Sequence, residues 1–172
     1  MVNLEFKKCT LKDAKLLTEV SWQTFYNAYK NDNDPTNFKQ FLDSTFNLNK
    51  ITTELNNHNC SFYFVYQNKQ LVGYFKLNEN EAQTEIFKED TLELERIYVL
   101  HEFQGKGIGK QMLDKAVTIA KEKSVSFIWL GVWKINTKAI AFYESQGFEK
   151  FSSHIYRVGN ENQEDWLMKK DF

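Results

Sequence analysis

The sequence predicts a mixed α/β fold, in which helices come first and strands with two embedded helices follow. Three patterns support this prediction. Apolar residues recur at helical spacing in residues 14–25, and runs rich in aromatic and β-branched residues begin at Ser61. A turn with three glycines, within residues 105–109, then joins an alternating strand to a helical run. The 172 residues fit one domain, which we place at 1–172.

The first third of the chain is predicted to be mainly helical. Residues 4–6 alternate like a short strand, and Thr10 then offers an N-cap to a helix whose apolar face includes Leu17. Residues 31–35 combine Asn and Asp residues with the only proline, so the helix is expected to end there. Two short helical patterns follow.

The middle of the chain is typical of antiparallel strands. Residues 61–66 are aromatic and β-branched, residues 67–70 form a tight turn, and residues 71–77 return, which predicts a β-hairpin. After a polar loop at 78–90, residues 92–99 form a third strand.

Two further helices and three strands complete the predicted fold. Residues 107–123 carry apolar residues at helical spacing, and the apolar run 127–132 is typical of a buried strand. A second helix, 137–146, is followed directly by glycine, as helix ends often are. Residues 154–158 and 165–168 are predicted to pair as a terminal hairpin.

Composition excludes several classes of protein. The formal net charge is −1, from 22 basic and 23 acidic residues, which argues against an electrostatic nucleic-acid binder. The sequence has no run of the roughly 18–20 apolar residues that a membrane helix needs, and its first residues lack a signal-peptide core. Cys9 and Cys60 are too few for a disulfide framework, so we expect a cytoplasmic location. His58, His101 and His154 are scattered, and we expect no metal site.

Acidic residues gather in the polar loop before the third strand. The members are Glu79, Glu81, Glu85, Glu89 and Asp90. A solvated loop is the simpler explanation, and a local acidic patch is the alternative.

The glycine turn has a direct use in binding an anion. Without side chains the backbone can approach a ligand closely, and its N–H groups converge with the positive end of the following helix. The dinucleotide pattern G-x-G-x-x-G fails because Lys110 stands where the third glycine belongs. The P-loop pattern also fails, because Gly105 and Gly109 are one residue too close and Gln111 follows Lys110.

A third phosphate-binding pattern fits. Gln104, Gly107 and Gly109 match [QR]-x-x-G-x-[GA], the acetyl-CoA pyrophosphate signature of the GNAT acetyltransferase superfamily, and Val99 supplies the β-branched residue before it. Residues 136–148 read NTKAIAFYESQGF and match the second pattern of that family, an Asn followed by A-x-x-F-Y and a closing G-F. The chain therefore resembles the GNAT superfamily.

The resemblance extends over nearly the whole chain to one group of that family. Residues 94–98, 128–133 and 139–143 are similar to the bacterial PaiA-type spermidine/spermine N-acetyltransferases. The resemblance implies the GNAT fold, a mixed and mostly antiparallel central sheet flanked by helices, with a splayed strand pair that binds acetyl-CoA. It also implies that residues 92–148 are the cofactor-binding core and that residues 1–60 form the acceptor side.

The family implies roles for the residues around the cofactor. Backbone groups of the third strand would bind the pantetheine arm at a bulge and polarise the acetyl carbonyl, and the amides of the glycine turn would bind the pyrophosphate. Asn136 would bond the pantetheine arm, although its position also suits an N-cap. The expected cofactor-binding residues are Ile97, Tyr98, Val99, Gln104, Gly105, Lys106, Gly107, Ile108, Gly109, Lys110, Asn136 and Tyr143.

Two side chains are candidates for proton transfer. Tyr143, a phenol with a reference pKa of about 10, can protonate the departing thiolate as general acid, or it only packs beside Phe142. Glu95 is the candidate base, acting through water, because polyamine acetyltransferases of this family place a glutamate there. Strict alternation puts Glu93, Glu95 and Ile97 on one face of the strand. The opposite face would hold Leu92, Leu94, Arg96 and Tyr98. Glu93 is therefore a rival base, and a carboxylate without a role is a further alternative.

The acceptor pocket is expected between the N-terminal helices and their loop. The candidate residues are Trp22, Tyr26, Tyr29, Asp32 and Asp34. They would supply apolar walls and anionic ends for a polycation. Core packing for Trp22 and solvent exposure for the two aspartates are the alternatives.

These observations predict an acetyl-CoA-dependent N-acetyltransferase for a small-molecule primary amine, of the polyamine type, with CoA as a product. The amine would attack directly in a ternary complex. Another small amine, a protein or peptide N-terminus, and a non-catalytic CoA-binding sensor remain open. Neither nucleic acid nor a membrane is expected as a partner, and the aromatic content leaves room for a homodimer.

Overall fold

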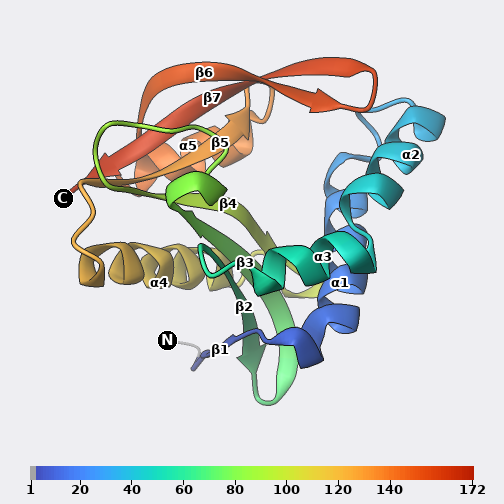
Figure 1. Cartoon of the computed structure of the whole chain (residues 1–172), viewed down its shortest axis with the longest axis horizontal. Coiled ribbons are helices and arrows are strands. Elements are labelled where there is room, and N and C mark those ends of the chain that lie inside the picture. The colour runs from blue at the N-terminus through green and yellow to red at the C-terminus, as the bar shows by residue number, and fades with distance from the viewer. Residues whose placement is uncertain (1–2) are drawn as a thin grey trace.

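The computed structural model describes residues 3–172 and confirms the predicted α/β fold (Figure 1). Its centre is a seven-stranded sheet in the order β1-β2-β3-β4-β5-β7-β6. Neighbouring strands are antiparallel except for β4 and β5, which are parallel. The strands are β1 (Glu5–Lys8), β2 (Cys60–Gln67), β3 (Gln70–Glu79), β4 (Thr91–Val99), β5 (Phe127–Trp133), β6 (Glu149–Val158) and β7 (Glu161–Asp171).

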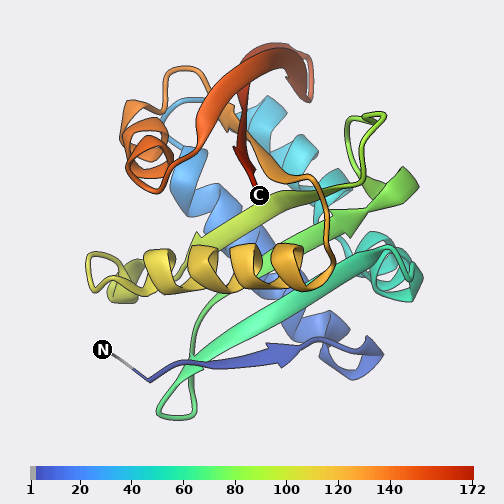
Figure 2. The ribbon, with the colours of Figure 1, turned by 90° about the vertical axis from the view of Figure 1, so that its left-hand side faces the viewer.

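Helices cover both faces of this sheet. The α-helices of the described chain are α1 (Ala14–Tyr29), α2 (Pro35–Thr45), α3 (Leu48–Asn56), α4 (Ile108–Glu122) and α5 (Thr137–Ser145). Figures 1 and 2 show α4 against one face, while α1 and α3 lie against the other. None of the helices in residues 3–172 combines the length and apolar character needed to cross a membrane.

Two layers of apolar side chains hold these helices to the sheet. On one side, Met112 and Ala116 of α4 are fully buried in a cluster with residues of the central strands. On the other side, Leu17 of α1 and Ile51 of α3 pack against Phe64 of β2. The helical spacing of these residues explains why the sequence predicted each helix.

The terminal β6–β7 hairpin reaches back to the N-terminal helices. Phe25, Phe38 and Val158 share one buried cluster. Asn37 of α2 fixes the hairpin tip, because its Nδ2 donates to the Val158 carbonyl at 3.0 Å and its Oδ1 accepts from the Asn160 amide at 3.0 Å. Segments from opposite ends of the chain therefore form one wall of the molecule.

A β-bulge in β4 corrects one prediction. Leu94 and Arg96 pair with consecutive residues of β3, so Glu95 is an extra residue without a partner. Before the bulge Leu94 packs beneath α4, and after it Ile97 does so, whereas Tyr98 contacts Phe25 of α1. The expected alternation, which grouped Ile97 with the glutamates and Leu94 with Tyr98, is wrong because the bulge reverses which residues face each side.

Candidate active site

A cavity opens where β4 and β5 separate. The two strands pair along only three positions, from Thr91 with Phe127 to Glu93 with Trp129, and then diverge. The resulting cavity has a volume of about 260 Å³ and is lined by α1, β4, β5, α5 and the β6–β7 hairpin. It brings together the predicted residues Tyr29, Glu95, Ile97, Tyr98, Asn136 and Tyr143.

The glycine turn lies between β4 and α4. Gly105 and Gly107 have φ values of +75° and +76°, the left-handed region that favours glycine. A Cβ at either glycine would meet no atom within 4 Å, so open space lies beside the turn. Within the described chain, the amides of 105–110 donate to no protein acceptor, and the first bond of the helix runs from the Gln111 amide to the Gly107 carbonyl at 3.4 Å. Unpaired amides at a helix start suit a phosphate group.

Polar side chains of the turn surround these unpaired amides. Lys106 is exposed on the turn, and Lys110 pairs with Asp114 at 2.8 Å at the start of α4. Gln104 donates from Nε2 to the Val99 carbonyl at 3.1 Å and so ties the turn to the end of β4. The residues present therefore fit the pyrophosphate of coenzyme A.

Asn136 and Tyr143, at the start and within α5, line the cavity on the side of β5. Asn136 is the N-cap of α5, and its Oδ1 accepts from the Ala139 amide at 3.1 Å. The ring of Tyr143 packs on Phe142 and Phe148, with centroids 5.3 and 5.9 Å away. Burial, and to a lesser extent the charge of Tyr29, raises the pKa of Tyr143, so its phenol stays protonated at neutral pH.

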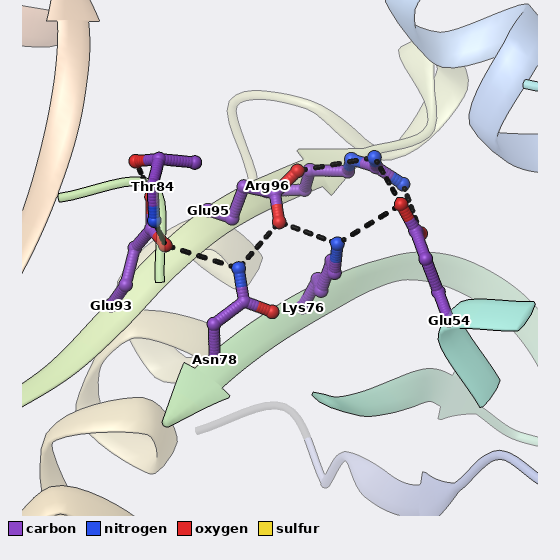
Figure 3. Close-up of polar contacts among 7 residues, drawn as sticks. All are labelled: Glu54, Lys76, Asn78, Thr84, Glu93, Glu95 and Arg96. Carbon is purple, nitrogen blue, oxygen red and sulfur yellow. Dashed lines mark hydrogen bonds and ion pairs between the residues drawn. The ribbon is translucent and has the colours of Figure 1, made fainter. Parts of the chain in front are cut away.

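Glu95 is held by fixed cationic and amide donors (Figure 3). Its carboxylate contacts Lys76 at 2.5 Å, Arg96 at 3.1 Å and Asn78 Nδ2 at 2.6 Å. Burial alone would raise the pKa of Glu95, but Arg96 and Lys76 outweigh it and lower that pKa to about 2. Glu54 of α3 closes the network by contacting both Lys76 and Arg96 at 3.3 Å.

Glu93 is also fully engaged, although its pKa moves the other way. The Thr84 amide and hydroxyl donate to it at 2.8 and 2.5 Å, and Asn78 Nδ2 donates at 3.0 Å. Burial, and then the charge of Glu95, raises the pKa of Glu93. Neither glutamate therefore has a carboxylate oxygen free of close donors.

Most of the expected acceptor residues lie elsewhere. Trp22 and Tyr26 stack on each other beside a shallow hollow outside the cavity, and Trp22 Nε1 donates to Asp43 at 3.0 Å. Asp34 is the N-cap of α2 and accepts from the Asn37 amide at 2.9 Å, whereas Asp32 is exposed in a turn. The structure thus brings only Tyr29 of this set into the cavity.

Sequence reasoning missed three residues of the site. Asp165 and His154 line the cavity from facing positions of the hairpin, and Glu85 contacts His154 from the polar loop. The loop was expected to be solvated, yet Phe87 anchors it by packing on Trp129. Only the alternation within the last two strands could have paired His154 with Asp165. The described residues contain no group of three or more His, Cys, Asp and Glu side chains placed to hold a metal ion.

One protein family accounts for the glycine turn, the separation of β4 from β5 and the cavity between them. The profile of the acetyltransferase (GNAT) family matches residues 17–148. This chain belongs to the GNAT acetyltransferase family. It is therefore an N-acetyltransferase, and acetyl-CoA is its acetyl donor, as the sequence predicted.

Full-length relatives support this assignment. An uncharacterized N-acetyltransferase in the pepI 3′ region of Lactobacillus delbrueckii subsp. lactis is 36% identical over 99% of this chain and 98% of its own length. A spermidine N(1)-acetyltransferase of Thermoplasma acidophilum is 25% identical over 99% of both chains. The crystal structure of the PaiA N-acetyltransferase of T. acidophilum in complex with coenzyme A has a TM-score of 0.77, with 22% identity and 99% coverage of both chains. This last likeness establishes the shared fold.

Proposed function

We propose that this GNAT enzyme acetylates a primary amine of a polyamine such as spermidine or spermine by direct attack in a ternary complex. The charge of the cavity carries the proposal. Glu93, Glu95 and Asp165 line it, and Glu54 and Glu85 contact lining residues. The opposing cations are Arg96, Lys76 and the titratable His154. Because an excess of carboxylates favours a ligand with several ammonium groups, the cavity suits a polycation better than a neutral or acidic acceptor.

One relative adds support. The 25% identical T. acidophilum protein is named a spermidine N(1)-acetyltransferase. We assign Asp165, which lines the cavity, to binding an ammonium group of the acceptor. The carboxylate of Glu95 is already bound by Lys76, Arg96 and Asn78. Its pKa of about 2 also makes it a poor proton acceptor, so the predicted role as direct base has little support.

The geometry of the cavity and the glycine turn also supports roles in binding the cofactor. The amides of 105–110 would bind the pyrophosphate, with Lys106 and Lys110 beside them, and the backbone of 97–99 together with Asn136 would bind the pantetheine arm. Tyr143 would donate the proton that the departing thiolate takes up. The role of residues 97–99 in binding the pantetheine arm is supported by the stretch of β4 that does not pair with β5.

We also propose a reducing, cytoplasmic location, in line with the free thiols of Cys9 and Cys60. The homodimer stays an expectation.

A thiol-release assay with a panel of amines tests the function. We expect kcat/KM to be at least about tenfold higher for spermidine and spermine than for a monoamine of equal length, because one ammonium–carboxylate contact of about 1.4 kcal/mol corresponds to tenfold. Faster turnover of a peptide N-terminus or of the monoamine would replace the polyamine proposal. Acetyl-CoA binding without thiol release for any amine would identify a sensor.

Tyr143→Phe belongs in the same assay. Removing the hydroxyl should lower kcat by about 10²- to 10⁴-fold and leave the Kd for acetyl-CoA unchanged, because the ring still packs on Phe148. An unchanged kcat would remove Tyr143 from the mechanism.

A further inference from the structure

His154 stands on the cavity wall between two carboxylates. Its Nδ1 lies 2.9 Å from Glu85 Oε1, and its Nε2 lies 3.8 Å from Asp165 Oδ2. Gly131 of β5 lies close to the pair, since a Cβ there would lie 3.5 Å from Nε2 and 3.3 Å from Asp165 Oδ2, and all three residues line the cavity. The imidazole is therefore held by Glu85 on one side and borders the cavity.

Local structure explains how these residues meet. His154 and Asp165 are direct partners in the β6–β7 register. The loop that carries Glu85 is fixed by Phe87, which packs on Phe151 of β6 at 5.6 Å, and by Gln83, whose Oε1 accepts from Trp129 Nε1 at 2.8 Å. The three side chains come from separate segments that the fold holds in place.

The hydrogen bond to Glu85 determines the tautomer of the neutral ring. A carboxylate can only accept, so Nδ1 carries the hydrogen and donates it, and the lone pair lies on Nε2. At 3.8 Å, Asp165 is too far from Nε2 for a hydrogen bond, so this nitrogen is left to accept a proton from the cavity. The oxygens of Glu93 and Glu95, by contrast, are already bound by close donors.

We propose that His154 is the base that deprotonates the acceptor amine, with Glu85 as the positioning residue that orients its ring. The proposal rests on the amine-binding role given above to the cavity. The ammonium is attracted by Asp165, one of its N–H bonds breaks, and the electron pair stays on the amine nitrogen. The proton bonds to Nε2, directly or through one water, and later leaves to solvent, because His154 is partly exposed.

The surrounding charges support this role. Asp165 of β7 and Glu85 of the loop face the ring directly. Tyr156 follows on the same side of β6, and Glu93, Glu95 and Arg96 of β4 and Tyr29 of α1 line the rest of the cavity. Asp165, and then Glu85, raises the pKa of His154 above its usual 6.5 despite the opposing effect of burial. This shift brings the pKa of the imidazole closer to the pKa of the acceptor ammonium, which favours transfer of the proton.

The pH profile of kcat/KM tests the proposal. Because the base works only when neutral, activity should rise with pH through a pKa above 6.5. His154→Gln should lower kcat/KM by about 10²-fold or more and remove this rise with pH, the acidic limb of the profile, while the Kd for acetyl-CoA stays unchanged. Glu85→Gln should lower kcat/KM less than His154→Gln does, because the amide oxygen can still accept from Nδ1 and orient the ring. It should also move this pKa to a lower value, because it removes a carboxylate that raises it.

Three controls keep the test decisive. His58→Gln, at an exposed site, should change neither rate nor limb. The pKa of the His154 ring measured by NMR should agree with the pKa of the acidic limb of kcat/KM, in both wild type and Glu85→Gln. This comparison does not depend on which amine is the acceptor. The profile is measured with the best amine of the panel, so a failure of the polyamine proposal leaves this test intact. A limb that persists in His154→Gln and vanishes in Glu95→Gln would overturn the proposal.

Discussion

At the scale of single residues, the buried charges beside the cavity depend on one another. Lys76 and Arg96 are 3% and 7% exposed, and both contact Glu54 and Glu95. Removing one partner of a buried ion pair leaves an uncompensated charge, which costs far more than the loss of a surface pair. The network therefore fixes Glu95 at the bulge of β4.

Glu54→Ala should destabilise the protein by about 3–5 kcal/mol in urea unfolding, because two buried cations lose a partner. The matched control is Lys39→Ala, which breaks the exposed Lys39–Asp43 pair and should cost below about 1 kcal/mol. Equal costs for the two variants would contradict the prediction.

The folded-state pKa of Glu95 lies below its unfolded value, so its contribution to stability is present above that unfolded value of about 4.3 and is lost as pH falls toward 2.

Some of these residues could be predicted from the sequence and others could not. Gly107, Asn136 and Tyr143 lie in short motifs whose spacing reflects one turn and one helix, and the structure places Asn136 and Tyr143 on one cavity. The residues of the ion-pair network around Glu95 come from α3, β3 and β4, and no local pattern links those segments. Asp34 was assigned to the acceptor by charge alone, whereas its position before Pro35 already suited an N-cap.

At the scale of elements, the start of α4 is the part most sensitive to a single change. Gly107 adopts φ +76° as the helix N-cap, and the amides of 108–110 donate to no acceptor among residues 3–172. Both features depend on the left-handed backbone at this position.

Gly107→Ala should raise the Kd for acetyl-CoA, because a side chain at positive φ costs about 1–2 kcal/mol and shifts the amides. At 1.4 kcal/mol per factor of ten, the expected weakening is about five- to thirtyfold by calorimetry. Ser124→Gly is the control at the other end of the helix, where φ is +57°. It should stabilise the protein and leave the Kd unchanged. A Kd for Gly107→Ala within twofold of wild type would argue against the assigned phosphate site.

Elements were predicted more completely than their pairing. The hairpin of β2 and β3, the helices α4 and α5 and the terminal hairpin all follow from periodicity and turn residues, and the structure confirms them. The family resemblance implied a bulge in the third strand, but its position at Glu95 could not be predicted, because an extra residue in one strand is defined only by its partner strand.

At the scale of the whole molecule, the cavity is closed by two ends of the chain. Its walls include α1 on one side and the β6–β7 hairpin on the other. Asn37 of α2 joins the tip of this hairpin to the N-terminal helices through Val158 and Asn160. The proposed acceptor side therefore depends on a contact far from the glycine turn.

Asn37→Ala should cost about 1–3 kcal/mol of stability, because it removes two hydrogen bonds to the backbone. We expect the KM for the amine to rise while the Kd for acetyl-CoA stays unchanged, as measured by steady-state kinetics and calorimetry. The control is Asn49→Ala on the exposed side of α3, which should alter neither. A rise in both constants would show that the hairpin supports the cofactor side as well.

The separation of β4 from β5 has a consequence for aggregation, because it leaves part of a strand edge unpaired. Beyond Glu93, β4 no longer pairs with β5, so its backbone on that side resembles the rim of a sheet. Such rims recruit strands from other chains and promote aggregation. Here the rim lies within the sheet, with β3 on one side and the strands β5, β7 and β6 on the other, rather than at an outer edge. A strand from another chain therefore has less access to these polar backbone groups than to an outer edge, and the cavity leaves them to the pantetheine arm that we propose binds there.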